Sequence, residues 1–519
     1  MRQQLIIKIL PSEAASQDVI KEKIQEHLAL ASEVVTGFNI IRRSIDARGK
    51  QPGIQLSLEV FLNEPYFYPK RQNIELANVS ASPRTVLIAG AGPAGLFAAL
   101  KLIEQGIKPV LLERGKDVRS RRRDLATLNK EGIINEESNY CFGEGGAGTY
   151  SDGKLYTRSK KRGDINRILN ILVNFGADEN ILYDAHPHIG TNKLPEIISA
   201  IRKKILDCGG IFLFEKKITD LIITGEKLTG VFTHSGDRFD GDALILATGH
   251  SARDIFMLLH QKKILIEAKP FAIGVRVEHP QQLIDSIQYH CPHRDPFLPP
   301  ASYNLVEQVN GRGVFSFCMC PGGIIAPAST ANHELVVNGW SPSKRNNPFA
   351  NSGMVVSVEE KDFKNLSEKY GPLAALFFQK EVEEKAFDHG GGNFVAPAQR
   401  LTDFTSKIFS SSLPGCSYLP GINSALLHDV LPPFVYSSLA KGFKEFGKKM
   451  KGYFTNEAVV VATESRTSSP VRIPRDPVSL QHPQIKGLYP CGEGAGYAGG
   501  IVSAAMDGER VATMIKMMK

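Results

Sequence analysis

The chain has 519 residues, of which 42% are hydrophobic, and its mean hydropathy is −0.14. This length allows two or three domains with a large core, while every apolar run is too short for a membrane-spanning helix. The net charge of +8 is only mildly basic, so charge gives little support for a nucleic-acid partner.

The seven cysteines are odd in number and scattered along the chain. This favours a reducing compartment over a disulfide framework. The apolar stretch near the N-terminus is too short for a secretory signal. We therefore expect a cytoplasmic protein that acts on a small molecule, and the sequence predicts no particular oligomeric state.

Residues 1–78 have the pattern of a small separate module. The expected elements are a strand, a helix and two more strands, at 5–10, 13–30, 38–46 and 54–61. Ser12 is the expected cap of the helix. The module lacks the aromatic sheet residues of an RNA-recognition motif. A short linker at 77–83 separates it from the rest of the chain.

A short apolar strand at 86–89 runs directly into a glycine-rich turn. The turn has the spacing Gly90-x-Gly92-x-x-Gly95 and leads into an apolar helix pattern at 96–103. In a dinucleotide-binding unit the first glycine allows the tight turn and the second admits the pyrophosphate. The third lets the helix pack on the strand. The N–H groups at the start of this helix would face the phosphates.

A second strand at 109–112 ends at Glu113, about twenty residues after the glycines, where a carboxylate can accept from ribose hydroxyls. Strand, glycines, helix, strand and acid in this register predict a nucleotide-binding unit. An arginine-rich run follows at 119–123. It is either a solvated helix face or a source of one or two cations for the cofactor phosphates, and Arg122 is the selected candidate.

The α/β pattern continues to about residue 265. The expected elements are a helix at 194–206, a strand at 211–214, a hairpin of 217–224 with 227–233, and a buried strand at 243–246. A glycine-dense stretch at 141–154 lies between these units. Its N–H groups could form an anion-accepting nest; the alternative is a flexible loop.

From about residue 266 to 455 the alternation of strands and helices is interrupted. Short strands are expected at 272–278, 314–319, 335–339 and 354–358, and helices at 371–386 and 432–450. A dinucleotide-type pattern then returns in LYPCGEG at 488–494, followed by Gly499, Gly500 and an apolar helix. No second strand and ribose acid follow it, so we expect no dedicated NAD(P) domain.

Four segments together favour FAD over NAD. They are the glycine-rich turn at 90–95 with Glu113, the strand-rich segment at 217–218, the turn at 247–249, and the YPCGE motif at 489–493. This arrangement is similar to the glutathione-reductase-like FAD flavoproteins. The resemblance implies that Glu493 binds the ribityl chain and that the next helix faces the flavin. The residues expected to bind FAD are Gly90, Gly92, Pro93, Ala94, Gly95, Glu113, Arg114, Arg122, Gly146, Gly148, Thr149, Ile218, Thr248, Gly249, Gly492, Glu493, Gly500 and Ile501.

Longer strings extend the resemblance over nearly the whole chain. They are RSIDAR at 43–48, GGAGTYSDGK at 145–154, AHPHIGT at 185–191, ATGHSAR at 247–253, SFCMCPGG at 316–323 and RTSSP at 466–470. With them the chain resembles the bacterial FAD-dependent proteins named NAD(FAD)-utilising dehydrogenases. The resemblance implies an N-terminal module, an FAD domain and an inserted domain, but no substrate.

The fold expected is therefore α/β: a Rossmann-like FAD-binding domain with an inserted α+β domain and a small N-terminal βαββ module. The segments are 1–78 for the module, 84–265 for the first part of the FAD-binding domain, 266–455 for the inserted substrate or cap domain, and 456–519 for the C-terminal part of the FAD-binding domain.

Four side chains are candidates for the reacting face. Cys318 and Cys320 would share one face of a strand, because strand side chains alternate; they are either redox-active or two buried small hydrophobes. His250 follows the turn at 247–249. Arg466 would bind an acidic substrate or stabilise reduced flavin. No metal site is expected, because too few ligands cluster in the sequence.

The leading hypothesis is an FAD-dependent oxidoreductase that transfers hydride between a donor, with NAD(P)H as the candidate, and an unidentified organic acceptor. The alternatives are a flavin-dependent RNA-modifying enzyme and a non-catalytic flavin-binding redox sensor that uses the two cysteines as a switch.

Overall fold

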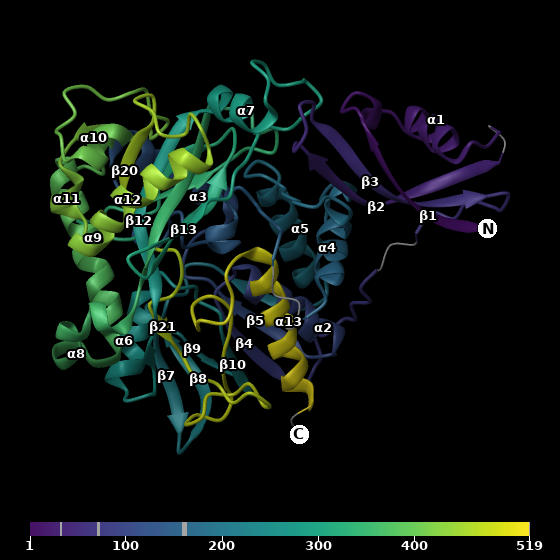
Figure 1. Cartoon of the computed structure of the whole chain (residues 1–519). Coiled ribbons are helices and arrows are strands. Elements are labelled where there is room, and N and C mark those ends of the chain that lie inside the picture. Colours follow the sequence, from purple (N-terminus) through teal and green to yellow (C-terminus); the bar gives the residue numbers. More distant parts are fainter. Residues whose placement is uncertain (32–33, 70–72, 158–162, 518–519) are drawn as a thin grey trace.

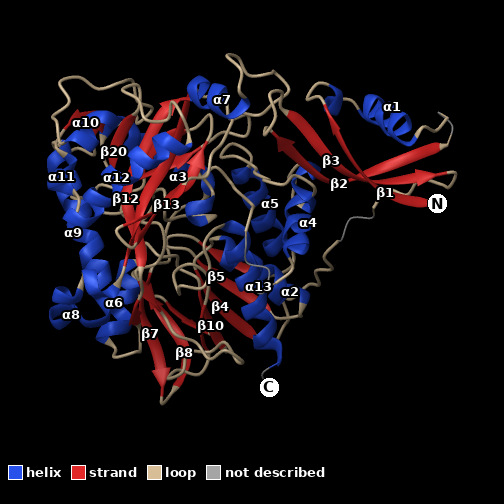
Figure 2. Ribbon diagram, in the orientation of Figure 1, coloured by secondary structure: helices blue, strands red, loops and turns tan. Residues whose placement is uncertain are grey.

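The computed structural model describes residues 1–31, 34–69, 73–157 and 163–517. A small N-terminal unit lies to one side of a larger body that contains two main sheets with helices around them (Figure 1). Figure 2 shows how strands and helices alternate in that body. None of the helices in the described ranges is both long and apolar enough to cross a membrane.

The N-terminal unit is an antiparallel sheet with the strand order β1-β3-β2 and one helix. Its elements are β1 (Arg2–Ile9), α1 (Gln17–Leu28), β2 (Val35–Asp46) and β3 (Gly53–Leu62). The predicted cap at Ser12 is wrong: residues 13–15 form a separate 3-10 turn, and the Ser16 side chain caps α1 by accepting from the Val19 N–H. The helix buries Ile20 and Ile24.

A five-stranded parallel sheet with the order β22-β10-β4-β5-β6 forms the centre of the nucleotide-binding part. Its strands are β4 (Thr85–Ala89), β5 (Lys108–Leu112), β6 (Ile211–Leu213), β10 (Ala243–Leu246) and β22 (Leu488–Pro490). This confirms the predicted α/β class with a parallel sheet. Because the strands are parallel, the turns after β4, β5, β10 and β22 meet at one edge.

Helices cover one face of this sheet and a smaller sheet covers the other. The helices are α2 (Pro93–Glu104), α4 (Ile165–Asn174), α5 (Leu194–Asp207) and α13 (Ile501–Met517). The helix α3 (Val118–Glu131) follows β5 but extends away from this layer, and its Leu128 packs in a separate cluster with Phe394. The opposite side carries β7 (Ile218–Thr224), β8 (Lys227–Thr233), β9 (Arg238–Asp240) and α6 (Arg253–Gln261). Val86 and Ile88 of β4 pack on the helical side, and Leu87 and Ala89 on the other, as strand alternation requires.

The second main sheet has seven strands in the order β13-β14-β17-β12-β20-β18-β19 and is antiparallel except at β18-β19. The strands are β12 (Phe271–Pro280), β13 (Val306–Val309), β14 (Arg312–Cys320), β17 (Phe349–Val358), β18 (Ala396–Arg400), β19 (Ile422–Ser424) and β20 (Val459–Glu464). We call residues 266–467 the inserted domain, because β20 continues its sheet beyond the predicted end at residue 455.

The remaining elements surround this sheet. The hairpin is β15 (Ile324–Pro327) with β16 (Val337–Trp340), and the helices are α7 (Gln281–Tyr289), α8 (Lys364–Tyr370), α9 (Ala374–Gly390), α10 (Leu401–Ser406), α11 (Leu427–Val430) and α12 (Pro433–Lys449). The strands β11 (Glu267–Ala268) and β21 (Val471–Arg472) pair with each other. The chain therefore enters and leaves the inserted domain at the same place.

Candidate functional site

One cleft lies where the carboxyl edge of the parallel sheet faces the inserted domain. All but three of the residues predicted to bind FAD line it, and so do the four candidates for the reacting face. The lining residues among those predictions are Gly90, Gly92, Pro93, Ala94, Glu113, Arg114, Gly146, Gly148, Ile218, Thr248, Gly249, Gly492, Glu493, Gly500, Ile501, His250, Cys318, Cys320 and Arg466.

The three exceptions are Gly95, Arg122 and Thr149. At Gly95 a Cβ would lie 2.0 Å from the Gly90 carbonyl oxygen, so this glycine serves helix packing only. The Arg122 side chain is on the exposed face of α3, so the solvated alternative applies to it. The Thr149 hydroxyl is buried and donates to the Glu144 carbonyl oxygen. Gly95 and Thr149 shape the site without lining it, whereas Arg122 takes no part in it.

The glycine-rich turn leaves its backbone open to the cleft. Gly90 has φ +97°, and a Cβ there would lie 2.6 Å from the Ala247 carbonyl oxygen. Gly92 caps α2, with Pro93 in the first turn of the helix, and a Cβ at Gly146 across the turn would approach the Gly92 Cα to 3.1 Å. The helix start therefore presents free N–H groups to a cradle without side chains, which suits a pyrophosphate.

Glu113 is buried at the end of β5 and is already hydrogen-bonded to the backbone. Its Oε2 accepts from the Ala91 N–H at 2.8 Å, and its Oε1 accepts from the N–H groups of Gly115 and Gly143 at 2.9 Å. An ionised carboxylate has about four acceptor positions, so one on Oε2 remains for a ribose hydroxyl. The sequence motif did not predict that Glu113 also holds three loops together.

Arg121, rather than Arg122, is the arginine of the 119–123 run with a defined role. It is fully buried and donates to the carbonyl oxygens of Asn139, Tyr140 and Glu144. These bonds fix the glycine-dense loop next to the cleft. Within the predicted stretch at 141–154, the flexible-loop alternative does not apply around Glu144 and Thr149, which Arg121 holds by hydrogen bonds. The sequence could not predict this role for Arg121. Its partners are backbone carbonyl oxygens in a loop that follows α3, and the spacing of residues within a helix says nothing about them.

An ion pair behind the last motif positions its backbone. Asp507 of α13 is fully buried and forms a two-pronged pair with Arg475, with N–O distances of 2.6 and 3.0 Å. Asp507 also accepts from the Gly492 N–H at 2.8 Å. The neighbouring Glu493 accepts from the Gly500 N–H just before α13. Both acids thus fix the loop between β22 and α13.

His250 lies beside Glu493, with 3.8 Å between its Nε2 and the Glu493 Oε2. Burial lowers the pKa of His250, although Glu493 acts in the opposite direction. Its Nδ1 is buried and has no hydrogen-bond partner among the described residues. The imidazole is therefore neutral at neutral pH and offers the cleft a hydrogen-bonding group rather than a positive charge.

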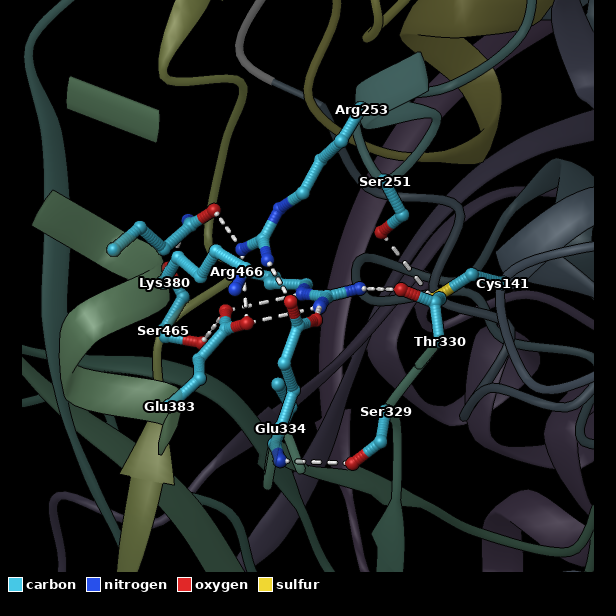
Figure 3. A network of polar contacts seen from close by, with 12 residues as sticks. Cys141, Ser251, Arg253, Ser329, Thr330, Glu334, Lys380, Glu383, Ser465 and Arg466 are labelled. Atoms are coloured by element: carbon cyan, nitrogen blue, oxygen red, sulfur yellow. Dashed lines mark hydrogen bonds and ion pairs between the residues drawn. The ribbon is translucent and has the colours of Figure 1, made fainter. Parts of the chain in front are cut away.

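Arg466 belongs to a buried cluster of two arginines and two glutamates at the back of the cleft (Figure 3). Its guanidinium donates to Glu383 at 2.9 and 3.1 Å and to Glu334 at 2.9 Å. Arg253 pairs with the same two acids at 2.8 and 3.0 Å. Arg466 therefore has carboxylate partners within the protein, and its role in binding an acidic substrate or stabilising reduced flavin stays a prediction.

Burial would raise the pKa of Glu383, but Arg253 and Arg466 hold it at about 2. The cluster joins α6 of the nucleotide-binding part to α9 of the inserted domain. Its members are distant in sequence, so no local pattern could have predicted it. It fixes the relation between the two walls of the cleft.

Cys318 and Cys320 line the cleft, but strand alternation does not place them there. A bulge interrupts the pairing of β14 between Phe317 and Cys320, and Cys318 has φ +45°. Cys318 is exposed to the cleft while Cys320 is buried. Although Cys318 is open to the cleft, the protein atoms around the cleft desolvate its thiolate and raise its pKa to about 11. Burial also raises the pKa of Cys320. Both are thus neutral thiols at neutral pH and poor nucleophiles.

Comparison with known proteins identifies the family. A family model described as "FAD-dependent protein, C-terminal domain-like" matches residues 270–467, one described as "FAD binding domain" matches residues 84–129, and a domain of unknown function matches residues 1–61. An "Uncharacterized protein" of Clostridium beijerinckii is 40% identical over 517 residues, which cover 96% of each chain.

Similar solved structures are more distant. The crystal structure of CtdE in complex with FAD and substrate 4 is 12% identical and covers 84% of this chain and 81% of that chain, with a TM-score of 0.33. The flavin-dependent brominase Bmp2 is 14% identical over 84% and 79%, with a TM-score of 0.34. Scores this low do not establish a shared fold. On the family models and the Clostridium beijerinckii relative, the chain belongs to a family of FAD-dependent proteins.

Proposed function

We propose that the protein is an FAD-dependent oxidoreductase that transfers hydride between a donor, with NAD(P)H as the candidate, and an organic acceptor. The resemblance to glutathione-reductase-like flavoproteins and to NAD(FAD)-utilising dehydrogenases supports this proposal. The observation that carries it is the cleft in which the nucleotide-binding turns face a wall of the inserted domain.

The residues of the cleft fit FAD. The N-terminus of α2 and the backbone at Gly92 and Gly146 would hold the pyrophosphate, and the remaining acceptor position of Glu113 would hold the ribose. Glu493 and the N-terminus of α13 would hold the ribityl chain and the pyrimidine edge. The close approach of these backbones leaves room for phosphates where side chains would block them.

Bound FAD supplies two-electron chemistry at its ring. The protein's own contribution is to place and enclose that ring. The cluster of Arg253, Glu334, Glu383 and Arg466 fixes the opposite wall, and the neutral His250 offers a hydrogen bond beside Glu493. The wall from the inserted domain would keep bulk water from the reacting face.

The visible spectrum of the purified protein during anaerobic titration with NADH or NADPH tests this function. We expect flavin absorbance in the purified protein and bleaching by one of the two donors. Protein that contains no flavin, and takes none up from added FAD, would contradict the cofactor. Flavin that neither donor reduces would contradict NAD(P)H as the electron source.

A further inference from the structure

Asn338 carries a hydrogen-bond donor whose direction is fixed by the protein. It lies on β16 and lines the cleft. Its Oδ1 accepts from the Gly339 N–H at 2.7 Å and from the Arg276 Nη2 at 3.4 Å. Both partners are donors only, so the oxygen of the amide must face them. The Nδ2 group then points the other way.

The Nδ2 atom of Asn338 is open to the cleft. It donates to none of the residues that the structure describes, and it is not among their buried unpaired side-chain atoms. An amide nitrogen left in this way has two hydrogens for a ligand. No other role in the fold accounts for them.

The support behind Asn338 is rigid. Arg276 is fully buried and bonds Glu464 at 2.7 Å and Asn351 at 2.5 Å. A Cβ at residue 339 would lie 2.0 Å from the Arg276 Nη1, so Gly339 leaves the room that this guanidinium needs. A donor backed by a locked ion pair keeps its orientation without a ligand, which is the property of a pre-organised binding group.

The same wall offers no charge to an ionic ligand. Glu383 and Glu334 pair with Arg466, and Glu464 pairs with Arg276 behind Asn338. Both arginines of this inserted-domain wall thus have carboxylate partners within the protein. Burying a carboxylate or phosphate here without a counter-charge would be strongly unfavourable.

We propose that the cleft takes an uncharged substrate with a hydrogen-bond-accepting atom, such as a carbonyl oxygen, and that the Asn338 Nδ2 binds this atom. The inference rests on the proposed function, because it assigns the acceptor of the same flavin site. In the simplest case two electrons and two protons leave the reduced flavin and convert a quinone to its hydroquinone.

Naphthoquinone and naphthoquinone sulfonate form a matched pair of probes. The FAD-loaded full-length protein is photoreduced anaerobically, and reoxidation of the flavin is followed at increasing probe concentration. The half-saturating concentration reports binding. We expect naphthoquinone to saturate the reaction and its sulfonate to bind more than about tenfold more weakly, since its charge finds no partner.

The substitution Asn338→Asp tests the contact. The carboxylate keeps the acceptor for Arg276 and Gly339 but replaces the donor with a negative charge. We expect the half-saturating concentration of naphthoquinone to rise about tenfold. The control Asn423→Asp makes the same change at an exposed position on β19 and should leave it unchanged. Asn338→Ala, which removes the donor without adding charge, should also weaken binding.

Three results would overturn the proposal. They are equal binding of the sulfonate, unchanged binding in Asn338→Ala, or no saturation with naphthoquinone in the wild-type holoprotein. If Asn338→Asp loses its flavin, Asn338→Ala decides the contact. Failure of the wild type to bind FAD would instead contradict the proposed function, so the two failures are distinguishable.

Discussion

Gly92 is glycine for reasons of space rather than backbone conformation. Its φ of −75° and ψ of −177° are accessible to any residue, and the heavy atom nearest to an added Cβ would be the Gly146 Cα at 3.9 Å. A side chain at this position would extend into the cradle at the start of α2. Substitution should therefore leave the fold intact and affect only what the cradle holds.

We predict that Gly92→Asp abolishes FAD binding, because its carboxylate would stand against the pyrophosphate. Gly92→Ala adds only a methyl group and should weaken binding far less. Flavin absorbance after gel filtration measures the result, and far-ultraviolet circular dichroism checks the fold. A folded Gly92→Asp protein with its full flavin content would refute the assignment of this turn.

The thiol of Cys318 offers a test of whether the cysteine pair is redox-active. Because desolvation within the cleft raises its pKa to about 11, the thiolate is scarce at neutral pH and increases as the pH rises toward that value. We predict alkylation by iodoacetamide on the order of a hundredfold slower at pH 8 than for a free thiol of pKa about 8.5. Mass spectrometry of Cys318, with Cys318→Ser as control, measures the rate. Fast labelling at pH 7 would favour the redox-sensor alternative instead.

At the scale of elements, α9 carries two adjacent glutamates in opposite environments. Glu383 is fully buried between Arg253 and Arg466, while the Glu384 side chain is 42% exposed beside Lys380. The folded state holds the pKa of Glu383 below its usual range. The carboxylate therefore stabilises the fold above about pH 5 and loses this effect as the pH falls toward 2.

We predict that Glu383→Gln destabilises the protein by about 3 kcal/mol, because two buried guanidinium groups would share one carboxylate. The control Glu384→Gln should cost about 0.5 kcal/mol or less. Urea unfolding at neutral pH measures both free energies. Equal stability of the two variants would mean that the cluster does not hold the cleft walls together.

The nucleotide-binding turn could be predicted from sequence because its determinants are local. Strand, glycines, helix and Glu113 follow one another within about thirty residues, and the structure places β4, α2 and β5 there. Three other features depend on contacts between distant segments: the pairing of β20 with β12, the loop bonds of Arg121, and the neutralisation of Arg466. Residue types alone do not predict such contacts.

The whole molecule contains one nucleotide-binding parallel sheet within the described residues. The sheet of the inserted domain is mostly antiparallel and has no glycine-rich turn leading into a helix. We therefore predict no separate tight site for NAD(P). Calorimetry on FAD-saturated protein should show at most weak binding that competes with ligands of the flavin face. A tight site independent of flavin occupancy would contradict this.

We propose that the inserted domain covers the reacting edge of the flavin. A cofactor held only by the carboxyl edge of the parallel sheet would leave its ring open to solvent. The pairing of β11 with β21 keeps the inserted domain at that edge, and its residues Phe317, Cys318 and Asn338 line the cleft opposite Glu493. Substrate pockets commonly form at such domain interfaces.

We predict that a structure with bound FAD will show the isoalloxazine ring within about 4 Å of at least one of Phe317, Cys318 and Asn338. The buried cluster around Arg466 should keep its geometry, because its charges are balanced before the cofactor binds. Loss of FAD from Gly92→Asp should in turn leave the inserted domain in place, since its attachment through β11, β21 and Arg253 does not involve the cradle. A ring that faces solvent, away from the inserted domain, would show that the substrate pocket lies elsewhere.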